Sequence, residues 1–200
     1  MALDPSACSS APTWRLWIDR CGGYDLKTGE RWSVGGARPD TAADIQVQSD
    51  WRRNEGWIVR QGGDYFWKPL DPNDRSDRLL GSGDTVPTIG AAQLKFTKPS
   101  PLSSTALLTL TTPHRFNHHV DASLLVDQTV LVGPTADNHI RCSALEQSAV
   151  ILYRNGAWQA KLQPTLGTPA GGEEWKNEFV ELVPGRRVSV GELDMTLEQT

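Results

Sequence analysis

Apolar and polar residues alternate with a period of two at several points along the chain. Ile45 and Val47 alternate with glutamines, and Leu94 and Phe96 alternate with polar neighbours. Such alternation predicts strands with one face in a core and the other in water. No window of a dozen residues carries the apolar spacing of an amphipathic helix without an intervening Gly or Pro. The pattern therefore predicts an all-β protein.

Turn sequences separate the predicted strands. Gly62-Gly63, Asn155-Gly156 and Pro184-Gly185 each lie between apolar runs, and the chain holds 18 Gly and 13 Pro. Gly supplies positive φ and Pro fixes φ, so both residues favour tight turns and disfavour helix interiors. We expect short strands joined largely as hairpins.

The two halves of the chain carry the same order of predicted elements, which indicates a repeat. The matching segments are residues 32–36, 43–47, 56–60, 64–67 and 83–96 in the first half, and residues 130–134, 138–142, 149–154, 157–162 and 185–197 in the second. A stretch rich in Pro and Ser lies between the halves and is typical of an extended connector. We predict a disordered tail at 1–13, a domain at 14–98, a linker at 99–105 and a second domain at 106–200.

Charge and composition narrow the classes of partner. Twenty Lys and Arg against 24 Asp and Glu give a net charge of −4, which supplies no broad positive field for nucleic acid. The apolar runs are too short to span a membrane, and the N-terminus lacks the features of a secretory signal. These features favour a cytoplasmic protein. Cys8, Cys21 and Cys142 are odd in number and widely spaced, so we expect reduced thiols.

The order of elements resembles that of the forkhead-associated (FHA) domain. Asp44-Ile45 matches a family strand, and residues 80–90 match the closing motif, which contains Gly-Asp and a later Gly. The resemblance covers most of residues 14–98 and, more faintly, residues 105–198. It implies two β-sandwiches in tandem, each made of two twisted sheets, and a family function of binding phosphothreonine peptides through loops at one end of the sandwich.

Several positions depart from the family's ligand-binding pattern. Gly36 stands where the family has an Arg that contacts phosphate, and Arg52 stands where it has a Ser. Arg53 keeps the adjacent basic residue, whereas Glu55 replaces the His that holds the loop. Asn73 matches a loop Asn but is not followed by Gly. The second half departs further, with Pro134 at the Arg position and no matching turn at residues 144–148.

The candidate ligand site lies on the loops of the first half. Phosphate calls for Arg forks and hydrogen-bond donors, so the candidates are Arg38, Arg52 and Arg53, with Ser49 as a hydroxyl donor and Asn73 on the next loop. Trp51, in the same turn, is a candidate anchor for a partner. The competing interpretation is a solvated turn in which Asp50 and Glu55 neutralise the arginines.

Most of the eight tryptophans fit a structural role better than a recognition role. Trp32, Trp57, Trp67 and Trp158 occupy strand positions where a small sandwich needs large core residues. Trp14 and Trp17, near the N-terminus, are expected to pack the two domains together.

No recognised catalytic or cofactor motif occurs in the chain. The leading prediction is a non-enzymatic interaction protein that has no cofactor and docks a protein partner. If the family function is kept, that partner is phosphorylated on Ser or Thr. The first alternative is a scaffold that binds unphosphorylated protein or itself. The second is a metal-dependent enzyme that uses His114, His118, His119 and Asp121. Adjacent histidines point apart in an extended segment, so this alternative has less support.

Overall fold

The computed structural model describes residues 13–40, 42–71, 73, 76–163 and 178–199. These residues form strands, one short 3-10 helix, η1 (Asn117–His119), and no α-helix. The all-β prediction is confirmed. The tail expected at residues 1–13 lies outside the described residues except for Thr13. None of the described helical structure is long and apolar enough to cross a membrane.

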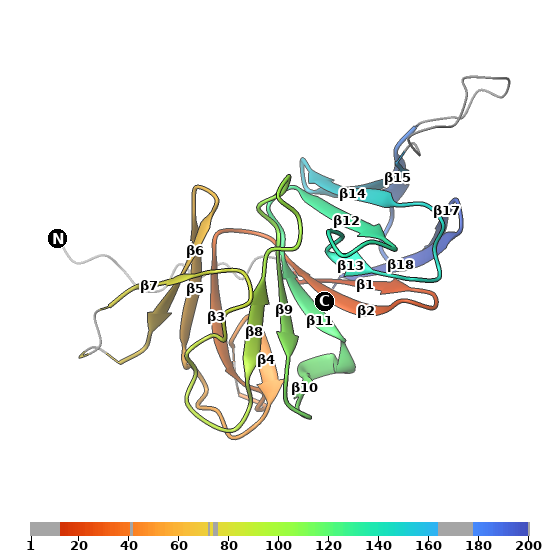
Figure 1. The fold of residues 1–200 in the computed structure, drawn as a ribbon. Helices are drawn as coiled ribbons and strands as arrows, with labels where there is room; N and C mark the ends of the chain where they lie inside the picture. Colours follow the sequence, from red (N-terminus) through yellow and green to blue (C-terminus); the bar gives the residue numbers. More distant parts are fainter. Residues whose placement is uncertain (1–12, 41, 72, 74–75, 164–177, 200) are drawn as a thin grey trace, which may run out of the picture.

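The strands form three sheets (Figure 1). The six-stranded sheet has the order β10 (Arg115–Phe116), β4 (Ile45–Gln48), β3 (Arg31–Gly36), β5 (Gly56–Gln61), β6 (Asp64–Pro69), β7 (Arg78–Leu80). The five-stranded sheet has the order β13 (Ile140–Arg141), β12 (Thr129–Gly133), β14 (Ala149–Arg154), β15 (Ala157–Leu162), β16 (Val180–Leu182). The seven-stranded sheet has the order β17 (Arg187–Val190), β18 (Leu193–Gln199), β1 (Trp14–Ile18), β2 (Gly22–Lys27), β11 (Ala122–Leu125), β9 (Ala106–Leu110), β8 (Leu94–Thr97).

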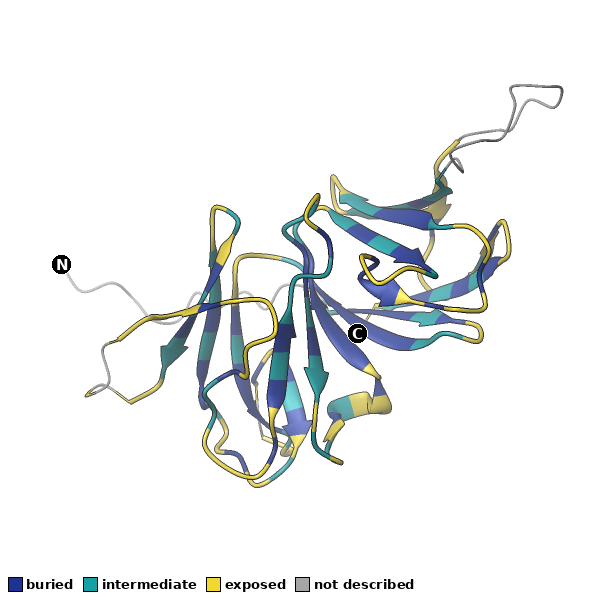
Figure 2. Ribbon diagram, viewed as in Figure 1, coloured by how far each residue is buried: buried dark blue, intermediate teal, exposed yellow. Residues whose placement is uncertain are grey.

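Two separate apolar cores divide the molecule into two lobes (Figure 2). In the first lobe, the six-stranded sheet packs against β8, β9 and β11. In the second lobe, the five-stranded sheet packs against β17, β18, β1 and β2. The seven-stranded sheet therefore serves both lobes through opposite faces. Leu124 and Leu125, neighbours on β11, point one into each core because successive side chains of a strand alternate between its faces.

The two halves of the sequence exchange their first strands. β1 and β2 come from the first half but complete the second lobe, where β1 pairs with β18. β9 and β11 come from the second half but complete the first lobe, where β9 pairs with β8. The lobes meet where β2 and β11 pair in parallel. The halves 14–98 and 106–200 predicted from the sequence therefore do not coincide with the two cores.

The segment predicted as a linker between domains lies between two adjacent strands of one sheet. β8 and β9 pair antiparallel, so residues 98–105 form the loop of a hairpin. Thr105 is fully buried and its hydroxyl donates to the Thr129 carbonyl at 2.7 Å. Tyr65 of the first lobe donates its hydroxyl to the Ser104 carbonyl at 2.6 Å. The segment is thus packed against both lobes.

The tryptophans fill both cores and the joint between the lobes. Trp32 and Trp67 are buried in the first core. Trp14 and Trp158 are buried in the second core, and the centroids of these two rings are 6.4 Å apart. Trp17 lies on β1 but packs against the first core, so this side chain bridges the lobes. Trp57 differs from the prediction, because it is half-buried beneath the guanidinium of Arg31, 4.8 Å from its ring centroid.

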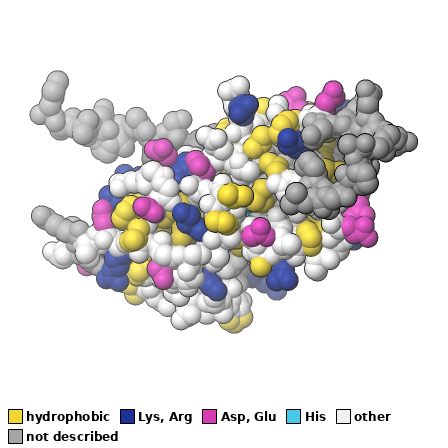
Figure 3. Space-filling model, turned by 45° about the horizontal axis from the view of Figure 1, so that its top comes forward, with side chains coloured by type: hydrophobic (Ala, Val, Ile, Leu, Met, Phe, Trp, Pro, Cys, Tyr) yellow, Lys and Arg dark blue, Asp and Glu magenta, His cyan; other side chains and the backbone are white. Residues whose placement is uncertain are grey.

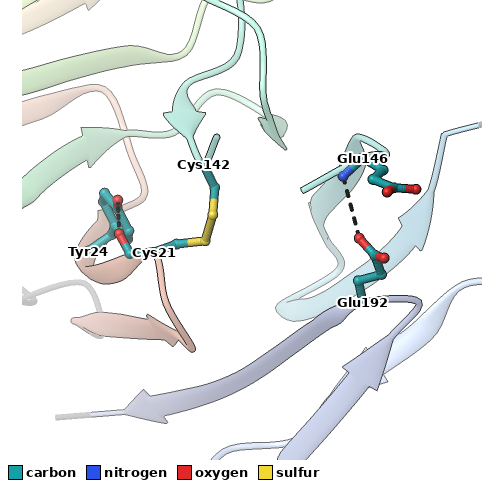
Figure 4. The surroundings of a disulfide bond; sticks show 5 residues. All are labelled: Cys21, Tyr24, Cys142, Glu146 and Glu192. Carbon is teal, nitrogen blue, oxygen red and sulfur yellow. Dashed lines mark hydrogen bonds between the residues drawn. A yellow bond between two sulfur atoms is a disulfide. The ribbon is translucent and has the colours of Figure 1, made fainter. Parts of the chain in front are cut away.

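A disulfide joins Cys21 to Cys142, which corrects the expectation of reduced thiols (Figure 4). Cys21 lies in the turn between β1 and β2, and Cys142 follows β13 in the second lobe. Their Cα atoms are 5.5 Å apart, within the range that a disulfide spans. Sequence reasoning missed this bond because the cysteines are 121 residues apart and meet only through the strand exchange. Cys8 lies outside the described residues.

Candidate functional site

Four loops of the first lobe gather beyond the same end of its six-stranded sheet. Three of them follow β3, β4 and β6, at residues 37–40, 49–55 and 70–71, and the fourth is the part of the connection from β7 to β8 around Ile89 and Ala91, whose N–H groups donate to Glu55 and Asp50. They gather because β5 begins opposite the end of β6, where Gly56 pairs with Pro69, and because β3 and β4 run in parallel. The ligand site predicted from the sequence lies on loops at this end of the sheet.

Glu55 holds two of these loops together from a buried position. Glu55 is only 7% exposed. Its carboxylate accepts hydrogen bonds from the Arg52 N–H at 2.7 Å and from the Ile89 N–H at 3.1 Å. Asp50 adds a second link by accepting from the Ala91 N–H at 3.2 Å. Hydrogen bonds from backbone N–H groups to carboxylates are charge-assisted and strong. Glu55 therefore orders the loop, the role that the family resemblance assigns to a His.

The FHA resemblance places a phosphate-contacting Arg at Gly36, where the packing of the loop leaves no room for a side chain. Its N–H donates to the Arg52 carbonyl at 2.8 Å, so the loop backbone lies directly against β3. A Cβ atom at this position would lie 2.5 Å from the Trp51 carbonyl oxygen, well inside van der Waals contact. The packing of the loop against β3 thus requires Gly at position 36.

The three predicted arginines have different surroundings. Arg53 forms an exposed ion pair with Asp40, and Arg38 donates to the Trp51 carbonyl at 3.4 Å. Arg52 is exposed, and its side chain lines a pocket described below. The structure therefore leaves Arg52 as the predicted arginine that is best placed to meet a ligand.

The other predicted site residues make contacts within the core and within their own loops. Trp51 is 0% exposed and lies in the first core, so its ring offers no surface to a partner. Ser49 accepts from the Trp51 N–H at 3.3 Å and caps the turn. Asn73 is exposed, and its N–H donates to the Asp71 carboxylate at 2.9 Å. Trp51 thus acts as a core residue, contrary to its predicted role as an anchor.

A pocket of about 280 Å³ opens between these loops. Its charged lining contains Arg52, Arg78, Asp71 and the buried Glu55, and its apolar lining includes exposed Leu70 and Ile89. The described residues that line it are Arg52, Glu55, Trp67, Pro69, Leu70, Asp71, Arg78, Pro87 and Ile89. Sequence reasoning had singled out neither Leu70 nor Ile89, because an apolar residue in a loop carries no signal that separates a core position from a pocket wall.

The histidines form no common site. The His114 ring is 2.9 Å from the Thr112 hydroxyl, His118 and His119 both lie in η1 with positive φ, and His139 is buried in the second lobe. Among the described residues, no three His, Cys, Asp or Glu side chains come together as metal ligands would. The His114, His118, His119 and Asp121 alternative therefore gains no geometric support.

Charges of both signs are interspersed on the face of the molecule shown in Figure 3, with apolar side chains between them. Comparison with models of protein families, with curated proteins and with solved structures finds no match to this chain.

Proposed function

We propose that this protein is a non-enzymatic interaction protein made of two FHA-type sandwiches, and that it docks a segment of a partner protein in the pocket of the first lobe. The observation that carries the proposal is the pocket itself, where cationic Arg52 stands beside exposed Leu70 and Ile89. Most of the nearby loop side chains instead support the fold.

The side chains around the pocket suggest the chemistry of the segment. Leu70 is 42% exposed and Ile89 is 66% exposed, so an apolar residue of the partner would bury surface against both. The Arg52 guanidinium offers a fork to a carboxylate or phosphate group. We therefore propose that the segment contains an anionic residue and a nearby apolar residue. The FHA resemblance implies that the anionic residue is phosphothreonine.

Rigid loops would favour such docking. Glu55 and Asp50 tie the loop that carries Arg52 to the loop that carries Ile89, so binding costs little ordering of the backbone. The acidic side chain of Asp71 in the pocket lining opposes a doubly charged phosphate.

The test is a phosphothreonine peptide library beside its unphosphorylated twin, with binding measured to the wild-type chain. We expect selected peptides to bind about tenfold more weakly to Arg52→Ala and to Ile89→Ser, a change of about 1.4 kcal/mol for each variant. Arg154→Ala, an exposed Arg in the second lobe, is the matched control and should bind as wild type does.

The two libraries separate the forms of the proposal. Preference for the phosphorylated library, lost in Arg52→Ala, would support phosphate recognition. Equal binding that still depends on Arg52 and Ile89 would support docking without phosphate. Failure of both libraries to bind, or binding that neither variant weakens, would rule out the pocket as the docking site.

A further inference from the structure

The N-terminal hairpin, β1 with β2, is held in the second lobe by contacts that another copy of the chain would also provide. β1 pairs with β18 along all five of its residues, from Trp14 with Gln199 to Ile18 with Met195. Trp14, Leu16 and Ile18 are buried in the second core. None of these noncovalent contacts requires the hairpin and the lobe to belong to one molecule, which is the condition for exchange of an element between copies.

Short connections link the hairpin and the lobes. Residues 28–30 join β2 to β3, and residues 126–128 join β11 to β12. The second connection is held against the hairpin, since the Val126 N–H donates to the Lys27 carbonyl at 2.8 Å. Redirecting either connection would seat the hairpin of one copy in the second lobe of another, with the same cores and the same ladders.

The disulfide pins the tip of the hairpin. Figure 4 shows Cys21 bonded across to Cys142, with the Tyr24 hydroxyl directed at the Cys21 carbonyl, 2.7 Å away. Cys21 lies at the opposite end of β2 from residues 28–30, so the hairpin is tied at both ends. With the bond formed, the hairpin cannot leave the second lobe of its own chain.

We propose that the second lobe is an acceptor for the N-terminal hairpin of a second copy of this chain, and that the Cys21–Cys142 bond blocks this exchange. A dithiol reductant transfers two electrons and two protons to the disulfide, which becomes two thiols, while the dithiol closes to its own disulfide. The reduced copies then trade hairpins and form a dimer in which every lobe is complete. The proposal is independent of the pocket in the first lobe.

The decisive experiment mixes two full-length variants that can form the bond only between molecules. In a Cys8→Ser background, Cys21→Ser keeps Cys142 and Cys142→Ser keeps Cys21. The two chains are incubated together under reducing conditions, concentrated and warmed to just below their unfolding midpoint, and then oxidised. We expect a covalent dimer of doubled mass, in which peptide mapping finds Cys21 of one chain bonded to Cys142 of the other.

Each variant alone is the matched control and should give no dimer of that linkage. Circular dichroism shows beforehand that both variants are folded. If the folded pair gives no Cys21–Cys142 dimer, hairpin exchange is refuted.

Wild-type protein tests the role of the bond by size-exclusion chromatography with light scattering. The reduced protein should gain a species of twice the monomer mass that grows with concentration and time, whereas the oxidised protein should stay at the monomer mass. Equal dimer formation in both samples would refute the disulfide as the block.

Discussion

At the scale of single residues, the turn at residues 50–55 exposes Arg52 and buries both Trp51 and Glu55. The FHA resemblance has a His at the position of Glu55, yet the buried Glu55 carboxylate orders two loops by accepting from their backbone N–H groups. The sequence predicts Trp51, beside two arginines, as an anchor for a partner protein, yet Trp51 is fully buried. The difference follows from the turn, which directs Arg52 to solvent and Trp51 into the core. Alternation of polarity cannot report such directions outside a strand.

His139 makes the stability of the protein depend on pH. The ring is 1% exposed, and its Nδ1 accepts from the Leu131 N–H at 2.8 Å, so the neutral form is the one that fits. Burial lowers the pKa of His139 from 6.5 to about 4, with a smaller opposing effect of the Thr105 backbone. Between these values the unfolded chain binds a proton that the folded chain does not. Stability from this group is therefore full above the unfolded pKa and falls as the pH decreases toward 4.

We expect the free energy of unfolding to fall by about 3 kcal/mol between pH 7 and pH 4 from this residue. Urea unfolding across this range measures the change, and His139→Gln should flatten it. His119→Asn, at an exposed His, is the control and should keep the wild-type slope. The same slope in His139→Gln and in wild type would show that other groups carry the pH dependence.

At the scale of elements, the hairpin of β1 and β2 contributes more to the second lobe than to the half of the chain that encodes it. Five of its large apolar side chains are buried in the second core, namely Trp14, Leu16, Ile18, Tyr24 and Leu26, whereas Trp17 packs against the first core. At roughly 2 kcal/mol for each buried side chain, the first half supplies on the order of 10 kcal/mol to that core. The disulfide at the tip adds a covalent constraint to the same element.

Loss of the disulfide should weaken the fold without changing it. The bond closes a loop of about 120 residues, for which chain entropy predicts about 5 kcal/mol of stabilisation. We expect the variant Cys21→Ser with Cys142→Ser to unfold at a lower urea concentration than the oxidised wild type, with a similar far-UV circular dichroism spectrum. Cys8→Ser is the control and should unfold as wild type does. An unchanged midpoint in the double variant would contradict the prediction.

At the scale of the whole molecule, the first lobe is encoded by one continuous stretch that is offset from the sequence repeat. β3 to β11 and the loops between them lie within residues 28–126 and supply every buried residue of the first core, to which β1 adds only the partly buried Trp17. Residues 14–98 lack β9 and β11, whose Ala106, Leu108 and Leu125 are fully buried there. The second lobe has no such continuous stretch, because it needs residues 14–27.

A fragment of residues 28–126 should therefore fold alone, and a fragment of residues 14–98 should not. Leu124 faces the second core and becomes exposed in the first fragment, so Leu124→Thr is included for solubility. Cooperative urea unfolding and a dispersed proton–nitrogen NMR spectrum are expected for 28–126 only. The reverse result would mean that the lobes do not depend on the exchanged strands.

The sequence by itself determined the all-β class, many of the turns and the repeated order of elements. Asn155-Gly156, for example, was predicted as a hairpin turn, and both residues have the positive φ that such a turn requires. These features are local, because alternation and turn chemistry depend on neighbouring residues. Only the tertiary structure decided which lobe receives each hairpin, which cysteines meet, and that Leu70 and Ile89 share a pocket with Arg52. Two similar halves offer similar strand edges, so the choice depends on long-range pairing and packing that no local pattern records.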